Sequence, residues 1–168
     1  MNKLYSWYNL MVFALGAVLG IISVIVPPLY IVDVKFYESP LFPVIRTGIE
    51  GMSKWSYLFL LSSGIFLGII YPKHKSLYGM FFGIIYSKQE LLLGASTMSL
   101  FPILAFLEMA KDPYSHNLWP IEFILYGFAT IPGIIGAYIG ATIRRKLVGL
   151  FLKSSNPDSV GSARRKTA

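Results

Sequence analysis

The sequence predicts an all-α integral membrane protein, folded as a four-span transmembrane helical bundle. Apolar residues make up 55% of the 168-residue chain and charged residues only 14%, whereas a soluble domain averages about 25% charged residues. Uncharged runs of roughly 20 residues recur, which is the length that crosses a hydrocarbon layer about 30 Å thick. These observations argue against a water-soluble globule and against a disordered chain. We expect one domain over residues 1–153, followed by a disordered basic tail over 154–168.

The first span is expected at about residues 8–27. The run from Tyr8 to Val26 carries no charge and is longer than the 7–15-residue apolar region of a signal peptide. It ends in Pro27-Pro28, without the small residues of a cleavage site. The run therefore predicts a retained transmembrane helix.

The second and last spans are expected at about residues 55–71 and 121–143. Each is close to the length needed for a crossing. Trp55 and Trp119 stand at their entrances, where the amphipathic indole ring prefers to lie. Between the first two spans, a short amphipathic helix is expected at about residues 44–53, packed over the mouth of the bundle.

The third apolar segment is too long for one simple crossing. Residues 77–110 would make a helix of about 50 Å. In one interpretation residues 77–87 form an extra buried or re-entrant segment, and the span is 91–109. In a second, one long tilted helix bends near Pro102.

A third interpretation places the crossing at residues 77–97, with Lys88 and Glu90 in the middle of the membrane. A charge at that depth costs roughly 3 kcal/mol or more, so the first two interpretations are favoured. Mid-membrane, the two charges would mark an ion or substrate path, whereas at the interface they would mean little.

The distribution of basic residues predicts the orientation of the bundle. With four spans, ten of the 15 Lys and Arg residues fall on the side of the two termini and four on the other side, with Lys88 assigned to neither. The positive-inside rule then places both termini in the cytoplasm. Loops 28–54 and 110–120 would face outward. Short loops and the lack of N-x-S/T sequons favour a bacterial inner membrane.

Small residues four positions apart predict close helix packing. Such pairs share one helix face and let another backbone approach. The face serves either packing within the bundle or the docking of a second copy or a partner subunit. The predicted packing residues are Gly16, Gly20, Gly64, Gly68, Gly133, Gly136 and Gly140.

The densest polar cluster surrounds the second outer loop. A turn at Pro113 would bring two carboxylates and an imidazole together, which suits a divalent metal ion or a proton relay. Alternatively, these residues serve as turn formers and helix caps, and no spacing typical of a metal site is present. The candidate residues are Glu108, Asp112, His116, Asn117 and Glu122.

Charge and composition exclude several function classes. The formal net charge is +7, and seven basic residues follow residue 143. We expect Arg144, Arg145 and Lys146 to contact anionic lipid, and we expect no nucleic-acid partner. The chain has no cysteine, which excludes disulfides and thiol chemistry. No nucleotide-binding or hydrolase motif occurs, and no cofactor is expected.

Three functions are compatible with the sequence. The favoured one is a non-enzymatic accessory, assembly or scaffold subunit in the lipid bilayer, which packs through its small-residue helix faces, as a homo-oligomer or with a partner subunit. The second is a transporter or channel component that uses intramembrane polar residues. The third is a membrane enzyme or metal site at the outer surface, around Asp112 and His116.

Overall fold

The computed structural model describes residues 2–32, 34–71, 85–114 and 119–154, and these residues form helices and connecting turns but no strand. The elements are α1 (Asn2–Pro27), a π-helical turn (Pro28–Val32), α2 (Pro43–Glu50), α3 (Lys54–Ile70), α4 (Ile85–Ala95), a 3₁₀ turn (Ser96–Met98), α5 (Leu100–Lys111) and α6 (Trp119–Ser154). The predicted all-α class is therefore confirmed. The predicted tail 154–168 and most of segment 77–87 lie outside the described residues.

Three described stretches are long and apolar enough to cross a membrane: Trp7–Val32, Gln89–Lys111 and Trp119–Leu150. α3 alone has 17 residues, and with α2 it forms a pair bent by 103° that counts as a fourth candidate if it is one broken span. The helices thus fit a membrane protein with three or four apolar crossings.

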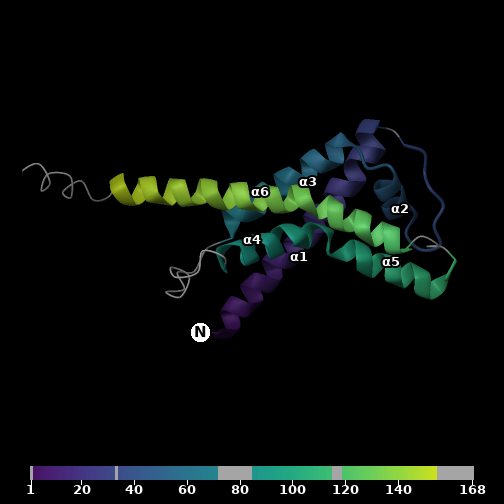
Figure 1. Ribbon diagram of the computed structural model, residues 1–168, viewed down its shortest axis with the longest axis horizontal. Coiled ribbons are helices and arrows are strands. Elements are labelled where there is room, and N and C mark those ends of the chain that lie inside the picture. Colours follow the sequence, from purple (N-terminus) through teal and green to yellow (C-terminus); the bar gives the residue numbers. More distant parts are fainter. Residues whose placement is uncertain (1, 33, 72–84, 115–118, 155–168) are drawn as a thin grey trace, which may run out of the picture.

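The helices run between two distinct ends of the molecule (Figure 1). The start of α1 and the end of α6 lie at one end, here called the terminal end. α2, the end of α5 and the start of α6 lie at the opposite end, here called the α2 end. α6 is a single rod that extends past the other helices at the terminal end.

α3 and α6 pack with their backbones in direct contact. A Cβ atom added to any of four glycines would overlap a backbone carbonyl of the facing helix, so the close approach requires glycine at these positions. The contacts are Gly64 against Gly133, Gly68 against Ala137, Gly136 against Leu61 and Gly140 against Ile65.

The glycines of α1 face the break between α4 and α5. Gly16 lies against the side chain of Ser96, and Gly20 lies against the backbone of Thr97. Gly133 faces the same turn from α6, with Thr97 Oγ1 2.7 Å from the position of its missing Cβ. All seven predicted packing glycines therefore contact other helices of the same chain.

The irregularity in the third segment lies before Pro102 rather than at it. The chain forms a 3₁₀ turn over Ser96–Met98, and Pro102 stands in the first turn of α5. Proline has no N–H to donate to the carbonyl four residues earlier, but it is tolerated in a first helical turn. The hydroxyls of Ser96 and Thr97 bond the carbonyls of Leu93 and Gly94, at 2.6 and 2.8 Å, within this turn.

The helical course of α1 also continues beyond the predicted end at Pro27. The two prolines are followed by a π-helical turn that reaches Val32. A proline ring clashes with the carbonyl four residues earlier in an α-helix, and a wider turn relieves that clash. The first apolar stretch therefore extends five residues further toward the α2 end than predicted, to Val32.

Candidate functional site

The described charged side chains gather at the two ends of the bundle. At the α2 end, charged groups surround Arg46 on α2. At the terminal end, α4 and α6 meet at Glu90. We name them the Arg46 cluster (Arg46, Glu50, Glu108, Asp112, Glu122) and the Glu90 cluster (Glu90, Tyr138, Thr142, Arg144, Arg145).

Arg46 connects α2 to the start of α6. Its Nη2 lies 3.0 Å from Glu50 Oε1, one turn along α2, and 3.7 Å from Glu122 Oε1 on α6. The side chains of Arg46 and Glu122 are 23% and 18% exposed. One guanidinium therefore serves two carboxylates and holds α2 against α6.

Glu108 is buried at the end of α5, with 4% of its surface exposed. Its Oε1 accepts a hydrogen bond of 3.4 Å from the backbone N–H of Leu41. Lys111 Nζ donates to the carbonyl of Pro40, also at 3.4 Å. The loop before α2 is therefore bonded to the end of α5.

Two large cavities lie beside Arg46. The larger, which we call the Arg46 cleft, has a volume of about 260 Å³ and lies between α2, α3 and α6. Its wall combines Arg46, Glu50 and Glu122 with the apolar side chains of Leu125 and Phe128, which are 58% and 64% exposed. A second cavity of about 140 Å³ is lined by Glu38, Ser39, Pro40, Arg46, Glu108 and Asp112.

The structure brings together only part of the predicted outer site. Glu108 and Asp112 line the same cavity, whereas Glu122 lines the Arg46 cleft. Asp112 Oδ1 accepts a hydrogen bond from the N–H of Tyr114, 3.1 Å away, as expected of a turn former. His116 and Asn117 lie outside the described residues. Among the described residues, no three His, Asp or Glu side chains are placed to hold a metal ion.

Sequence reasoning missed the role of Arg46. Arg46 lies in the loop 28–54 that was predicted to face outward, and no role was predicted for it. The spacing of Arg46 and Glu50, four residues apart on a short helix, indicates their ion pair. The contact between Arg46 and Glu122 joins residues far apart in the sequence, so no local sequence pattern predicts it.

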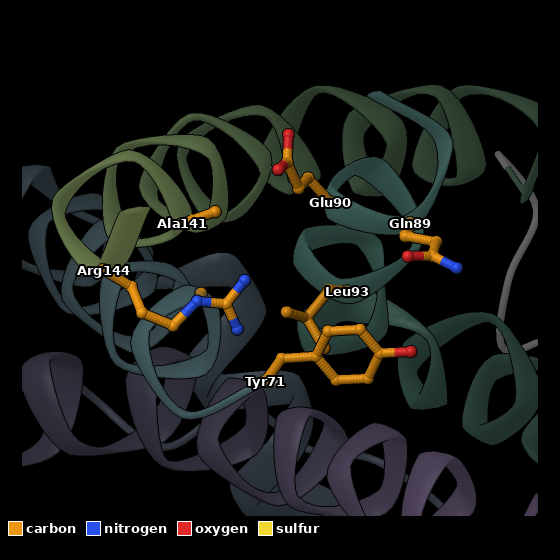
Figure 2. Close-up of a pocket in the computed structure, with 7 residues that line it drawn as sticks. Tyr71, Gln89, Glu90, Leu93, Ala141 and Arg144 are labelled. Carbon is orange, nitrogen blue, oxygen red and sulfur yellow. The ribbon is translucent and has the colours of Figure 1, made fainter. Parts of the chain in front are cut away.

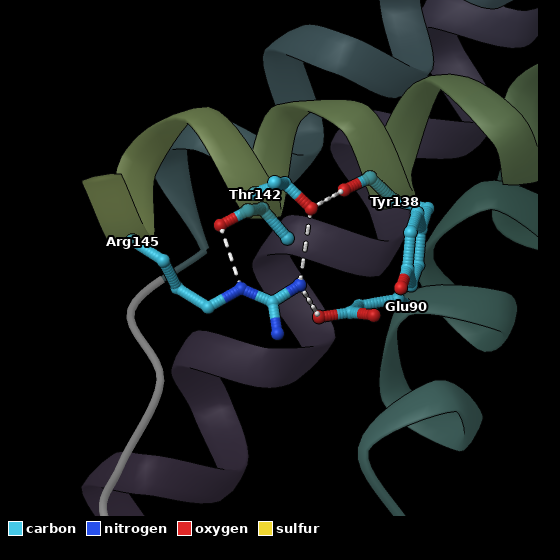
Figure 3. Close-up of polar contacts among 5 residues, drawn as sticks. Glu90, Tyr138, Thr142 and Arg145 are labelled. Atoms are coloured by element: carbon cyan, nitrogen blue, oxygen red, sulfur yellow. Dashed lines mark hydrogen bonds and ion pairs between the residues drawn. The ribbon is translucent and has the colours of Figure 1, made fainter. Parts of the chain in front are cut away.

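At the terminal end, Glu90 on α4 pairs with Arg145 on α6 (Figure 3). Glu90 is 9% exposed, and its Oε1 lies 3.2 Å from Arg145 Nη2. Arg145 also bonds Thr142 Oγ1 and the carbonyl of Ala141, and its guanidinium lies 5.9 Å from the centre of the Tyr138 ring. These contacts orient Arg145 toward the carboxylate.

This pairing places Glu90 at the level of Arg145, two residues beyond the last span predicted from the sequence. If α6 crosses the membrane with residues 121–143, Glu90 therefore lies near the interface rather than at mid-depth. The side chain of Lys88 lies outside the described residues. No protein family model matches the sequence, and no curated protein or solved structure matches it significantly.

Proposed function

We propose that the protein is a non-enzymatic membrane protein that acts as an accessory, assembly or scaffold subunit. Its partner docks on the part of α6 that extends beyond the bundle. The glycine faces favoured by sequence reasoning contact other helices of the chain, so the docking surface is assigned elsewhere.

The length of α6 supports this assignment. Its 36 residues make a helix of about 54 Å, whereas a hydrocarbon layer is about 30 Å thick. Because α6 continues straight past the other helices, its last turns leave the bundle (Figure 1). The span predicted at about residues 121–143 includes Ile143 and ends before Leu147 and Leu150.

The observation that carries the proposal is an uncovered apolar stripe that begins at the edge of the bundle and runs onto this extension. Ile143, Leu147 and Leu150 are 40%, 47% and 65% exposed. Their spacing of four and three residues places them on one helix face. Such a stripe is the usual docking face for a helix of another subunit.

Single cysteines test this docking face, because the native chain contains none. We expect Leu147→Cys to be crosslinked by a bismaleimide in native membranes to a product of one discrete mass. Gly149→Cys is the matched control, since Gly149 is exposed on another face of the same turn. Equal crosslinking of both variants, or of neither, would contradict the proposal.

The Arg46 cleft favours a second candidate, a transporter or channel component. Its volume of about 260 Å³ and its mixed charged and apolar wall suit a small amphipathic molecule. Uptake into proteoliposomes, lowered by Tyr57→Trp in the cleft wall, would favour this candidate over the first.

The proposal includes four spans, both termini in the cytoplasm and a bacterial inner membrane. The shared end of the two termini (Figure 1) and the basic residues near that end support it. Fusions of a reporter active only in the cytoplasm to each terminus test the orientation. Loss of reporter signal at either terminus would contradict it.

A further inference from the structure

A small cavity lies at the terminal end of the bundle, and it is lined by Arg144 but not by the neighbouring Arg145. It has a volume of about 20 Å³ and lies between the ends of α3, α4 and α6. Its lining residues are Gly68, Tyr71, Gln89, Glu90, Leu93, Ala141 and Arg144. Figure 2 shows the guanidinium of Arg144 entering the cavity beside Tyr71 and Leu93. Arg145, by contrast, bonds Glu90 outside this cavity.

Within the described part of the chain, Arg144 has an unsatisfied guanidinium. Its Nη1 is buried and has no hydrogen-bond partner. Glu90 is the nearest carboxylate in the cavity wall, but its Oε1 is bonded to Arg145, and its Oε2 is buried without a partner. The two arginines and one carboxylate leave a surplus of one positive charge.

Among the described residues that line the cavity, Glu90 is the one carboxylate. The sequence between α3 and α4, residues 71–84, includes Lys73 and Lys75 but no Asp or Glu. A buried guanidinium N–H group without a hydrogen-bond acceptor is unfavourable, because it has lost its bonds to water. An anion from outside the chain would satisfy Arg144.

The residues around the cavity indicate the chemical class of this anion. Arg144 follows the last predicted span, where lipid headgroups are expected, and its guanidinium matches a phosphate group in shape and charge. Exposed apolar side chains on both helices lie toward the middle of the bundle, where acyl chains are expected: Leu92 is two residues from Glu90 on α4, and Ile139 is five residues from Arg144 on α6. Basic pockets between transmembrane helices are typical sites for anionic lipids.

We propose that this cavity is a specific site for one anionic phospholipid. A phosphate oxygen of the lipid enters the cavity and accepts hydrogen bonds from Arg144, while the rest of the headgroup stays at the cavity mouth. The volume of about 20 Å³ admits one oxygen-sized group. Arg145 holds Glu90, and Lys146 attracts lipid only through its charge.

Three charge-matched variants test the site: Arg144→Gln, Arg145→Gln and Lys146→Gln. Each removes one positive charge from the same turn of α6. Native mass spectrometry of the detergent-solubilised full chain would measure binding of phosphatidylglycerol, with phosphatidylcholine as the neutral control. Inorganic phosphate, added as a competitor, distinguishes a free phosphate site from a lipid site.

We expect wild type and Lys146→Gln to retain one phosphatidylglycerol with similar affinity. Arg144→Gln should weaken binding by about tenfold or more, the effect of losing a hydrogen bond to a charged group. Excess inorganic phosphate should not displace the lipid. Equal weakening by Arg144→Gln and Lys146→Gln would overturn the proposal, as would displacement by phosphate or a preference for phosphatidylcholine.

A second measurement does not depend on the folding of any variant. Phosphatidylglycerol should raise the unfolding temperature of the wild-type chain more than phosphatidylcholine does at the same concentration. Equal shifts from the two lipids would show no preference for the anionic headgroup and would overturn the proposal. Neither outcome bears on crosslinking at Leu147, so this site and the proposed docking face succeed or fail separately.

Discussion

The middle of the bundle and its two ends are held together by different interactions. In the middle, glycines let the backbones of α3 and α6 touch, and no side chain lies between them at those points. At the ends, charged side chains connect helices across larger gaps, through Arg46 at one end and Arg145 at the other. The middle therefore depends on shape, and the ends depend on charge balance.

The balance of charge also differs between the two ends. Arg46 is shared by two carboxylates, whereas at the terminal end Glu90 pairs with Arg145, and Arg144 lines the same cavity as Glu90 without bonding it. The charge pairs at the α2 end therefore contain more carboxylates than arginines, and the Glu90 cluster contains more arginines than carboxylates.

The largest expected effect is in the middle of the bundle. Gly136→Ala places a methyl group against the carbonyl of Leu61, and backbone atoms cannot move aside as a side chain can. We expect a loss of about 3 kcal/mol or more in the free energy of unfolding. Thermal unfolding in detergent measures it.

Gly127→Ala is the control on the same helix, because no atom lies within 4 Å of its added Cβ. It should leave stability unchanged or raise it by up to about 1 kcal/mol, since alanine favours a helix. If both substitutions were tolerated equally, the backbone contact of α3 and α6 would be wrong.

A smaller effect is expected at the terminal end. Arg145→Gln leaves the carboxylate of Glu90 buried without its partner and should destabilise the protein by about 2 kcal/mol. The partial exposure of Arg145, 39% of its side chain, keeps the loss below that of a fully buried pair. Adding Glu90→Gln should restore most of the stability. Additive losses in the double variant would show that the two side chains do not interact.

At the α2 end, Arg46→Gln should cost about 1 kcal/mol, because Glu50 and Glu122 stay partly exposed to water after losing their partner. Hydrogen exchange should rise in α2 and leave α3 unchanged. Equal exchange in both helices would mean that Arg46 supports the whole bundle rather than the position of α2.

The smallest effect is expected between α1 and α3. The hydroxyls of Ser23 and Ser63 lie 2.9 Å apart. Interhelical hydrogen bonds in membrane proteins contribute about 0.6 kcal/mol on average. A double-mutant cycle with alanine at both positions should give a coupling energy of that size. A coupling energy of zero would show that this hydrogen bond does not stabilise the protein.

The sequence predicted what depends on local pattern. Apolar runs predicted the helices, and glycine spacing predicted which faces allow close approach. The pattern could not say which glycine face meets which helix, because Gly64 and Gly133 are far apart in the sequence. The 3₁₀ turn at Ser96–Met98 was missed, since the hydroxyl bonds that accommodate it form only within the folded turn.

The candidate sites were predicted less well than the fold. Glu90, Arg144 and Arg145 were each singled out, but as separate charges. Arg144 and Arg145 make different contacts because their side chains point in different directions from α6. The sequence alone does not show which of the two faces the carboxylate of Glu90. No role was predicted for Arg46, because its second partner, Glu122, lies on a helix more than 70 residues later in the sequence.

The central claim is that lipid surrounds the exposed apolar side chains in the middle of the bundle. Single cysteines replacing Ile135, half-exposed in α6, and Tyr114, 82% exposed beyond α5, test it directly. In intact membranes, a membrane-impermeant maleimide should label Tyr114→Cys and should label Ile135→Cys only after detergent is added. Equal labelling of both positions without detergent would contradict the account.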